Sequence, residues 1–276
     1  MERIKAAIEK SKQSRASAAA SKTVSIKQVA QQAAAVADDE LTNLEYIHTR
    51  TVELDLAHLE KNRIVALNKN DMASWAFDTI RTQVLQMMES KGWRTLAIVS
   101  PTPESGKTLT SINLAISIAQ QSQRTAMLVD LDFRRPRVGA YLGLHMPKSL
   151  NDYLEGTAEL TEVLVNPKLP RFVVLPTEKP VHKPSEALSS KKVENLIQDL
   201  RDRYESRIVI FDLPPVLTAD DAIAILPKID CALLVVGNGM SSQSDIEETM
   251  HLLAGVNLLG VVLNKAEIEQ RSYYYD

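Results

Sequence analysis

The feature that most constrains the fold of this chain is an alternation of short apolar runs with amphipathic helical stretches, which begins after Gly92. The apolar runs are Thr95 to Val99, Thr125 to Val129, Phe172 to Leu175, Ile208 to Phe211, Ala232 to Val236 and Gly260 to Leu263. Short runs rich in β-branched residues and separated by helices are typical of a parallel sheet covered on both faces. We therefore predict an α/β fold with a doubly wound, mostly parallel sheet over residues 92–265, with a ligand site at the carboxyl ends of its strands.

A helix is also predicted before the first run. Its apolar stripe consists of Phe77, Ile80, Val84 and Met87. Spacings of three and four residues place such a stripe on one helical face, so we expect Met87 and its neighbour Met88 in the core. The mixed segment from Leu54 to Asn68 predicts an irregular strap instead. Residues 46–91 are thus expected to pack on the core or on a neighbouring subunit.

Charge is distributed unevenly along the 276 residues. Residues 1–30 carry seven Lys or Arg and two Glu, a balance of +5, so the remaining residues carry −8 and the net charge is −3. We predict that residues 1–45 form a basic, disordered arm. This arm either contacts anionic lipid or an acidic partner, or is a solvated leader. The acidic net charge argues against a general nucleic-acid binder.

Cysteine usage and the lengths of the apolar runs bear on the compartment. The single cysteine, Cys231, lies in the apolar run IDCALLVVG, which excludes an internal disulfide and fits a reducing cytosol. No run approaches the roughly 18 to 20 apolar residues that a membrane span needs, and the N-terminus lacks the apolar stretch of a signal peptide. We expect a cytoplasmic protein.

The strongest local signal is the run SPTPESGKT, Ser100 to Thr108, between the first apolar run and a helical stripe. Gly106, Lys107 and Thr108 match the end of the Walker A pattern, although Pro101 stands where that pattern has its first glycine. In such a loop, backbone N–H groups bind phosphates, the lysine reaches the β and γ oxygens, and the threonine hydroxyl binds Mg²⁺. The loop therefore predicts a P-loop NTPase fold that uses ATP and Mg²⁺.

Aspartates follow two of the other apolar runs. Asp130 and Asp132 end the run AMLVDLD, and Asp212 ends the run RIVIFD. Because the carboxyl ends of parallel strands meet at one edge of a sheet, we expect these carboxylates beside the phosphate loop, with Thr108, Asp132 and Asp212 as Mg²⁺ ligands. A single aspartate after a strand also fits a cap or a turn, but three together indicate a site.

Taken together, these motifs resemble those of the bacterial tyrosine kinases of capsule and exopolysaccharide assembly (BY-kinases), which are similar to partition-type P-loop ATPases. The resemblance covers residues 70–276 and rests on Gly106 to Thr108, on Asp130, Asp132 and Arg134 in DLDFR, on Asp212, Pro214 and Pro215 in DLPP, and on a terminal tyrosine cluster. It implies a nucleotide site of Ser105, Gly106, Lys107, Thr108, Leu109 and Asn264, the last beside the base. It also implies that a flexible tail, residues 266–276, presents Tyr273, Tyr274 and Tyr275 as phosphoacceptors.

The same resemblance implies the chemistry and the partners. A tyrosine hydroxyl has a pKa near 10, so a carboxylate that accepts its proton favours phosphoryl transfer. Asp130 or Asp132 fits that role, while Lys107 and Arg134 would neutralise charge. The implied partners are a membrane-bound polysaccharide co-polymerase that activates the kinase, a phosphotyrosine phosphatase and further copies of this chain, at the inner face of the plasma membrane. No nucleic-acid partner is expected.

Two other functions stay open at this point: a partition-type ATPase, and a catalytically silent, nucleotide-switched scaffold of the export machinery. Partition ATPases place a signature lysine early in the phosphate loop, where this chain has Thr102. A silent scaffold has no chemical need for Lys107 together with three aspartates. Both arguments favour the kinase.

The chain departs from its family on the helix before the phosphate loop. Relatives carry the motif Glu-x-x-Arg-x-x-Arg there, whose charges pair between subunits of a ring. This chain has Trp75, Asp78 and Arg81 at those places. We therefore expect a weakened ring or one anchored by Trp75, unless Trp75 packs against the strap of its own chain.

Overall fold

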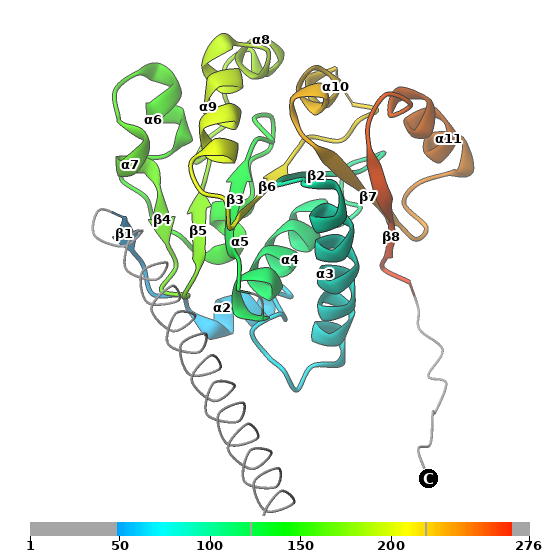
Figure 1. Cartoon of the computed structure of the whole chain (residues 1–276), viewed down its shortest axis with the longest axis horizontal. Helices are drawn as coiled ribbons and strands as arrows, with labels where there is room; N and C mark the ends of the chain where they lie inside the picture. Colours follow the sequence, from blue (N-terminus) through cyan, green and yellow to red (C-terminus); the bar gives the residue numbers. More distant parts are fainter. Residues whose placement is uncertain (1–48, 122, 219, 267–276) are drawn as a thin grey trace, which may run out of the picture. The chain divides into compact units, whose positions relative to one another are not determined.

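The computed structural model describes residues 49–121, 123–218 and 220–266, which form an eight-stranded sheet of order β1-β4-β5-β3-β6-β2-β7-β8 (Figure 1). The strands that run parallel to one another are β2 (Thr95–Val99), β3 (Thr125–Asp130), β5 (Phe172–Leu175), β6 (Arg207–Asp212), β7 (Cys231–Gly237) and β8 (Leu258–Asn264). The short strands β1 (Arg50–Thr51) and β4 (Val165–Asn166) pair with each other in parallel, and β4 is antiparallel to β5. The predicted doubly wound, mostly parallel sheet is confirmed.

Alternate residues of the strands supply two apolar cores, one on each face of the sheet. Leu96 and Ile98 of β2 face one core, which they share with α2 (Leu56–Lys61), α3 (Met72–Lys91), α4 (Lys107–Gln121) and α5 (Val138–Leu142). Ala97 and Val99 face the other core, which contains side chains of α9 (Lys191–Asp202) and α10 (Asp221–Ile225). Successive side chains of a strand point to opposite faces, and here both faces are apolar because helices cover both.

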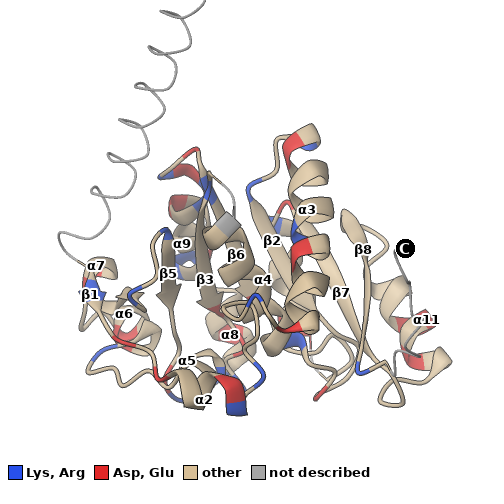
Figure 2. Cartoon of the chain, turned by 90° about the horizontal axis from the view of Figure 1, so that it is seen from below, with Lys and Arg blue, Asp and Glu red and all other residues tan. Residues whose placement is uncertain are grey.

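Further short helices lie in the connections. They are α6 (Leu150–Glu155), α7 (Leu160–Val163), α8 (Pro184–Leu188), the 3-10 helix η1 (Leu226–Lys228) and α11 (Gln243–Leu252). Charged residues are concentrated on helices and loops, while the strands in Figure 2 carry few of them. In the described part of the chain, none of the helices is both long enough and apolar enough to cross a membrane. Cys231 is buried in β7, where burial raises its thiol pKa to about 12.

Helix α3 corrects one expectation about the core. The side chain of Asp71 caps its N-terminus by accepting from the N–H of Ala73, and Gly92 ends it in the left-handed conformation. Val84 and Met88 are buried, but Met87 is 42% exposed, so its predicted place in the core was wrong. Consecutive helical residues point about 100° apart, and the inward face is set by Met88 rather than Met87.

The segment before α3 is more regular than predicted. Instead of an irregular strap it contains α2, whose first turn is capped by the side chain of Asp55. Asn113 of α4 then accepts hydrogen bonds from the N–H groups of Val65 and Ala66, at 2.8 and 2.9 Å. This asparagine fixes the segment on α4, the helix that begins at the phosphate loop.

The outer side of α3 carries the residues that differ from the family motif. Trp75 is 63% exposed, so within the described part of the chain it is not packed against the strap. Arg81 donates to Asp78 at 2.8 Å and to Ser117 of α4 at 3.1 Å. Arg81 and Asp78 are thus engaged within one chain, and Trp75 is left on the surface.

Candidate functional site

The phosphate loop, Ser100 to Gly106, joins the end of β2 to the first residue of α4. Its backbone is left-handed at Glu104, with φ 63°, and at Gly106, with φ 91°. A Cβ atom at Gly106 would lie 1.8 Å from Nδ2 of Asn264. This close approach requires glycine, which has no Cβ and accepts the positive φ.

Hydrogen bonds hold the loop in place. The Ser105 hydroxyl donates to the carbonyl of Thr102 at 3.0 Å, and Asn264 Nδ2 donates to the carbonyl of Ser105 at 3.0 Å. The hydroxyls of Thr102 and Ser241 are 3.1 Å apart and hydrogen-bonded. Thr102, which stands where partition ATPases have their signature lysine, therefore ties the loop to the β7–α11 connection.

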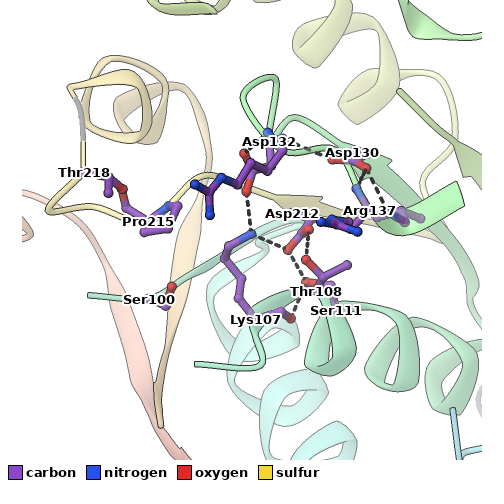
Figure 3. A network of polar contacts seen from close by, with 12 residues as sticks. Ser100, Lys107, Thr108, Ser111, Asp130, Asp132, Arg137, Asp212, Pro215 and Thr218 are labelled. Atoms are coloured by element: carbon purple, nitrogen blue, oxygen red, sulfur yellow. Dashed lines mark hydrogen bonds and ion pairs between the residues drawn. The ribbon is translucent and has the colours of Figure 1, made fainter. Parts of the chain in front are cut away.

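Lys107 lies between two carboxylates, one in the loop after β3 and one at the end of β6 (Figure 3). Its Nζ is 3.2 Å from Oδ2 of Asp132 and 3.2 Å from Oδ1 of Asp212. The Thr108 hydroxyl donates to Oδ2 of Asp212 at 2.6 Å, and the Ser111 hydroxyl donates to Oδ1 at 2.9 Å. The fold thus brings Lys107, Thr108, Asp132 and Asp212 into one cluster.

This cluster is buried and strongly charged. The side chain of Asp212 is fully buried, and those of Lys107 and Asp132 are 7% and 9% exposed. Burial alone lowers the pKa of Lys107, but the carboxylates around it outweigh burial and raise the pKa above its usual value. Burial raises the pKa of Asp212 even though Lys107 and Thr108 favour its charged form. Lys107 is therefore a cation that offsets the negative charge of the cluster.

Asp130 is fixed by the backbone rather than by Lys107. Its Oδ1 accepts from the N–H of Asp132 at 3.2 Å, and its Oδ2 accepts from the N–H groups of Arg137 and Val138, both at 3.0 Å. Complete burial, reinforced by the charge of Asp212, raises the pKa of Asp130 well above its usual value. Asp130 thus organises the loop between β3 and α5.

Asp132 lies at the surface end of this arrangement. Its Oδ1 accepts from the N–H of Arg135 at 3.1 Å, while its Oδ2 faces Lys107. Unlike Asp130, it retains some exposure to solvent. The two aspartates of DLDFR therefore have different surroundings, a distinction that the sequence alone does not make.

Arg134 is directed to a carboxylate outside the cluster. Its Nε and Nη2 donate to the two oxygens of Asp221, the first residue of α10, with Nη2 3.2 Å from Oδ1. The hydroxyl of Ser185 in α8 also donates to Asp221. Sequence reasoning missed Asp221 and Ser185 because each lies far along the chain from Arg134 and matches no motif.

Two more polar contacts were missed. Ser111 donates to the carbonyl of Lys107 as well as to Asp212, and its position four residues after Lys107 puts it on the same helical face, which was a usable signal. Thr177, after β5, donates to the carbonyl of Asp130 at 2.7 Å, and no local pattern predicts that contact. Leu109, expected to bind nucleotide, packs its side chain partly against the apolar core.

The arrangement fits a nucleotide with Mg²⁺. A loop that ends in Gly106 at the N-terminus of a 15-residue helix is suited to phosphates, and Mg²⁺ is usually held by one or two carboxylates together with phosphates and water. Within the described ranges, no group of three or more His, Cys, Asp or Glu forms a metal site of its own. The predicted tail tyrosines Tyr273 to Tyr275 and the predicted basic arm lie outside the described residues.

A parallel sheet with a phosphate loop after β2, whose lysine contacts one aspartate after β3 and another at the end of β6, defines a P-loop NTPase fold. A family model described as an AAA domain matches residues 94–257, more than half of the chain. Tyrosine-protein kinase CpsD of Streptococcus pneumoniae is 32% identical over 183 residues, which cover 65% of this chain and 79% of that protein. The chain belongs to the bacterial tyrosine kinase (BY-kinase) family.

Other relatives are longer or more distant. Tyrosine-protein kinase ptk of Acinetobacter johnsonii is 30% identical over 75% of this chain, which spans only 28% of that protein's length. The kinase domain of the Escherichia coli tyrosine kinase ETK superposes with a TM-score of 0.69 at 28% identity, covering 82% of this chain and 92% of that domain. The cell division ATPase MinD of Pyrococcus furiosus gives a TM-score of 0.53 at 26% identity, covering 62% of this chain and 71% of MinD.

Proposed function

We propose that this chain is an ATP-dependent protein tyrosine autokinase that regulates polymerisation and export of a capsule or exopolysaccharide. The observation that carries the proposal is the convergence of Lys107, Asp132 and Asp212 on one buried cluster at the start of α4. Membership of a family whose relatives are named tyrosine-protein kinases supports tyrosine as the acceptor.

In this proposal the phosphates of ATP bind at the N-terminus of α4. The proposed nucleotide contacts come from Ser105, Gly106, Lys107, Thr108 and Leu109, with Asn264 near the base. Thr108, Asp132 and Asp212 would hold Mg²⁺, which would supply positive charge against the negative charge that develops during transfer. Lys107 would exchange its carboxylate partners for phosphate oxygens.

The transfer forms one bond and breaks one. The tyrosine oxygen attacks the γ-phosphorus of ATP, the bond to the bridging β–γ oxygen breaks, and ADP leaves. We assign the phenolic proton to Asp132, on the carboxylate oxygen that does not bind Mg²⁺. The alternative base, Asp130, is fully buried and its oxygens already accept three backbone N–H groups, so it acts as a positioning residue in this scheme.

The proposed acceptors are Tyr273, Tyr274 and Tyr275, which react between molecules. Tyr273 is nine positions after Asn264, and about nine extended residues span roughly 30 Å, which suffices to reach a neighbouring site. The proposed partners are a membrane-bound polysaccharide co-polymerase, a phosphotyrosine phosphatase and further copies of this chain. The proposed location is the cytoplasm, at the inner face of the plasma membrane.

One assay separates the proposal from its two alternatives. Purified protein is incubated with labelled ATP and Mg²⁺, and phosphotyrosine, released phosphate and bound nucleotide are measured. A tyrosine kinase yields labelled tyrosine. A partition-type ATPase releases phosphate without labelling protein, and a silent scaffold binds nucleotide without turnover. Either of these two results contradicts the proposed function.

A further inference from the structure

An ion pair outside the lysine cluster links the loop after β3 to two other loops. The Asp221 side chain is fully buried and receives both Nε and Nη2 of Arg134, whose own side chain is 43% exposed. Asp221 also receives the Ser185 hydroxyl, which contacts Asp220 Oδ1 at 3.1 Å as well. Arg134, Ser185 and Asp221 follow β3, β5 and β6, which are adjacent in the sheet.

Because these strands are parallel, the three residues gather at the same edge of the sheet as the phosphate loop. Arg134 is two positions after Asp132, whose carboxylate contacts Lys107. The ion pair therefore lies next to the site and braces the loop that carries Asp132. The contacts come from Ser185 in α8 and Asp221 in α10.

The geometry fixes the direction of the guanidinium. Arginine has five N–H donors in a rigid fork, and the pair uses the side formed by Nε and Nη2. Nη1 of Arg134 has no partner among the described residues, so the group is oriented but still has donors to offer. Burial raises the pKa of Asp221, yet Arg134 and Ser185 outweigh burial and lower it, which keeps Asp221 anionic at neutral pH.

We propose that Asp221, itself held by Ser185, is a positioning residue that fixes Arg134 at the rim of the phosphoryl-transfer site. This inference rests on the proposed kinase function, in which Arg134 helps neutralise charge on the transferred group. A free arginine loses side-chain entropy when it orders around a transition state. An arginine that a buried carboxylate already fixes loses less side-chain entropy at that step. Asp221 should therefore favour phosphoryl transfer rather than ATP binding.

The kinetic test compares Asp221→Asn, Ser185→Ala and Arg134→Ala with the wild type in steady-state phosphotyrosine formation. Misplacement of a catalytic group lowers kcat by about 10- to 100-fold, and we expect this for Asp221→Asn with the KM for ATP changed less than about twofold. The double variant Arg134→Ala/Asp221→Asn should be no slower than Arg134→Ala alone, since the two residues act as one unit.

Matched controls separate positioning from general damage. Glu186→Gln also removes a carboxylate, from the exposed Lys183–Glu186 pair on the same helix as Ser185, and should retain wild-type kcat. Ser185→Ala removes a hydrogen bond that holds Asp221 but leaves its carboxylate in place, so it should lower kcat by a smaller factor than Asp221→Asn. It replaces Asp221→Asn in the test if thermal unfolding shows that Asp221→Asn is not folded. Equal activity of folded Asp221→Asn or Ser185→Ala and wild type, or additive losses in the double variant, would overturn the inference.

A spectroscopic readout tests the contact without catalysis. The Nε–H resonance of Arg134 in a ¹⁵N-labelled sample should be protected from solvent exchange in the wild type and should exchange rapidly in Asp221→Asn. Retained protection in that variant overturns the inference, whatever the kinetics. Absence of phosphotyrosine in the wild type overturns the proposed function instead, so the two failures are distinguishable.

Discussion

At the scale of single residues, Lys107 has two sets of candidate partners. Its Nζ contacts Asp132 and Asp212 at 3.2 Å each, and the proposed reaction needs the same nitrogen on phosphate oxygens. Lys107 can contact either set of partners because the nearby carboxylates keep its side chain charged. Bound phosphate would then take over the neutralisation of that charge.

Lys107→Met should abolish phosphotyrosine formation, with a loss on the order of 100-fold or more in kcat, because a charge aimed at the transferred group is removed. Lys91→Met, at the exposed C-terminal end of α3, is the matched control and should keep wild-type activity. Circular dichroism checks that both variants are folded. Wild-type rates in folded Lys107→Met would remove the phosphate loop from the mechanism.

We expect the stability of the fold to depend on pH through Asp130. Burial raises its pKa well above the usual value, so the folded protein keeps this proton at pH values where the unfolded chain has lost it. Its contribution to stability is therefore complete below the unfolded pKa and is lost as the pH rises through the folded pKa. The melting temperature of the wild type should thus fall as the pH rises over that interval. The melting temperature of Asp130→Asn should depend less on pH. A wild-type profile that rises with pH relative to Asp130→Asn would contradict this sign.

At the scale of elements, the phosphate loop is in close contact with the end of β8. Gly106 has a φ of 91° and no room for a Cβ beside Asn264. Sequence comparison with the Walker A pattern identifies Gly106 but gives no reason for its contact with Asn264, which is 158 positions further along the chain.

Gly106→Ala should displace Asn264 and distort the loop, because the left-handed conformation alone costs an L-residue about 1–2 kcal/mol. We expect nucleotide affinity, measured by titration calorimetry, to fall by at least about tenfold and the melting temperature to drop. Gly255→Ala is the control, since a Cβ there meets nothing within 4 Å. Unchanged nucleotide affinity in Gly106→Ala would exclude this loop as the phosphate site.

The strands of the sheet could largely be predicted from the sequence, whereas some contacts between loops could not. All six strands of the parallel core were predicted within two residues of their ends, because strands buried on both faces appear as continuous apolar runs. The two-residue strands β1 and β4 were not, since two residues carry no periodicity. The motif aspartates were predicted because parallel strands end at one edge, but the partner of Arg134 depends on how loops after three strands fold together.

At the scale of the whole molecule, assembly should depend on Trp75 more than on Arg81. The Arg81 side chain is 13% exposed and bonded to Asp78 and Ser117 of its own chain, whereas Trp75 is 63% exposed. Exposed tryptophans are frequent anchors of interfaces. In light scattering, Trp75→Ala should shift any oligomer towards monomer while Arg81→Ala leaves the oligomer intact. A stable ring that is lost on Arg81→Ala and indifferent to Trp75→Ala would contradict this expectation.

In the proposed mechanism, the site around Lys107 phosphorylates tyrosines of the tail in another copy of the chain. The most direct measurement mixes Lys107→Met protein that has an intact tail with active protein in which Tyr273, Tyr274 and Tyr275 are phenylalanine, in the presence of Mg²⁺ and ATP. Peptide mapping then locates phosphotyrosine. We predict phosphate on the tail of the Lys107→Met species. An unlabelled tail in that mixture, with wild-type protein labelling itself at a rate independent of concentration, would contradict transfer between molecules. Absence of phosphotyrosine even in the wild type would contradict the proposed kinase activity.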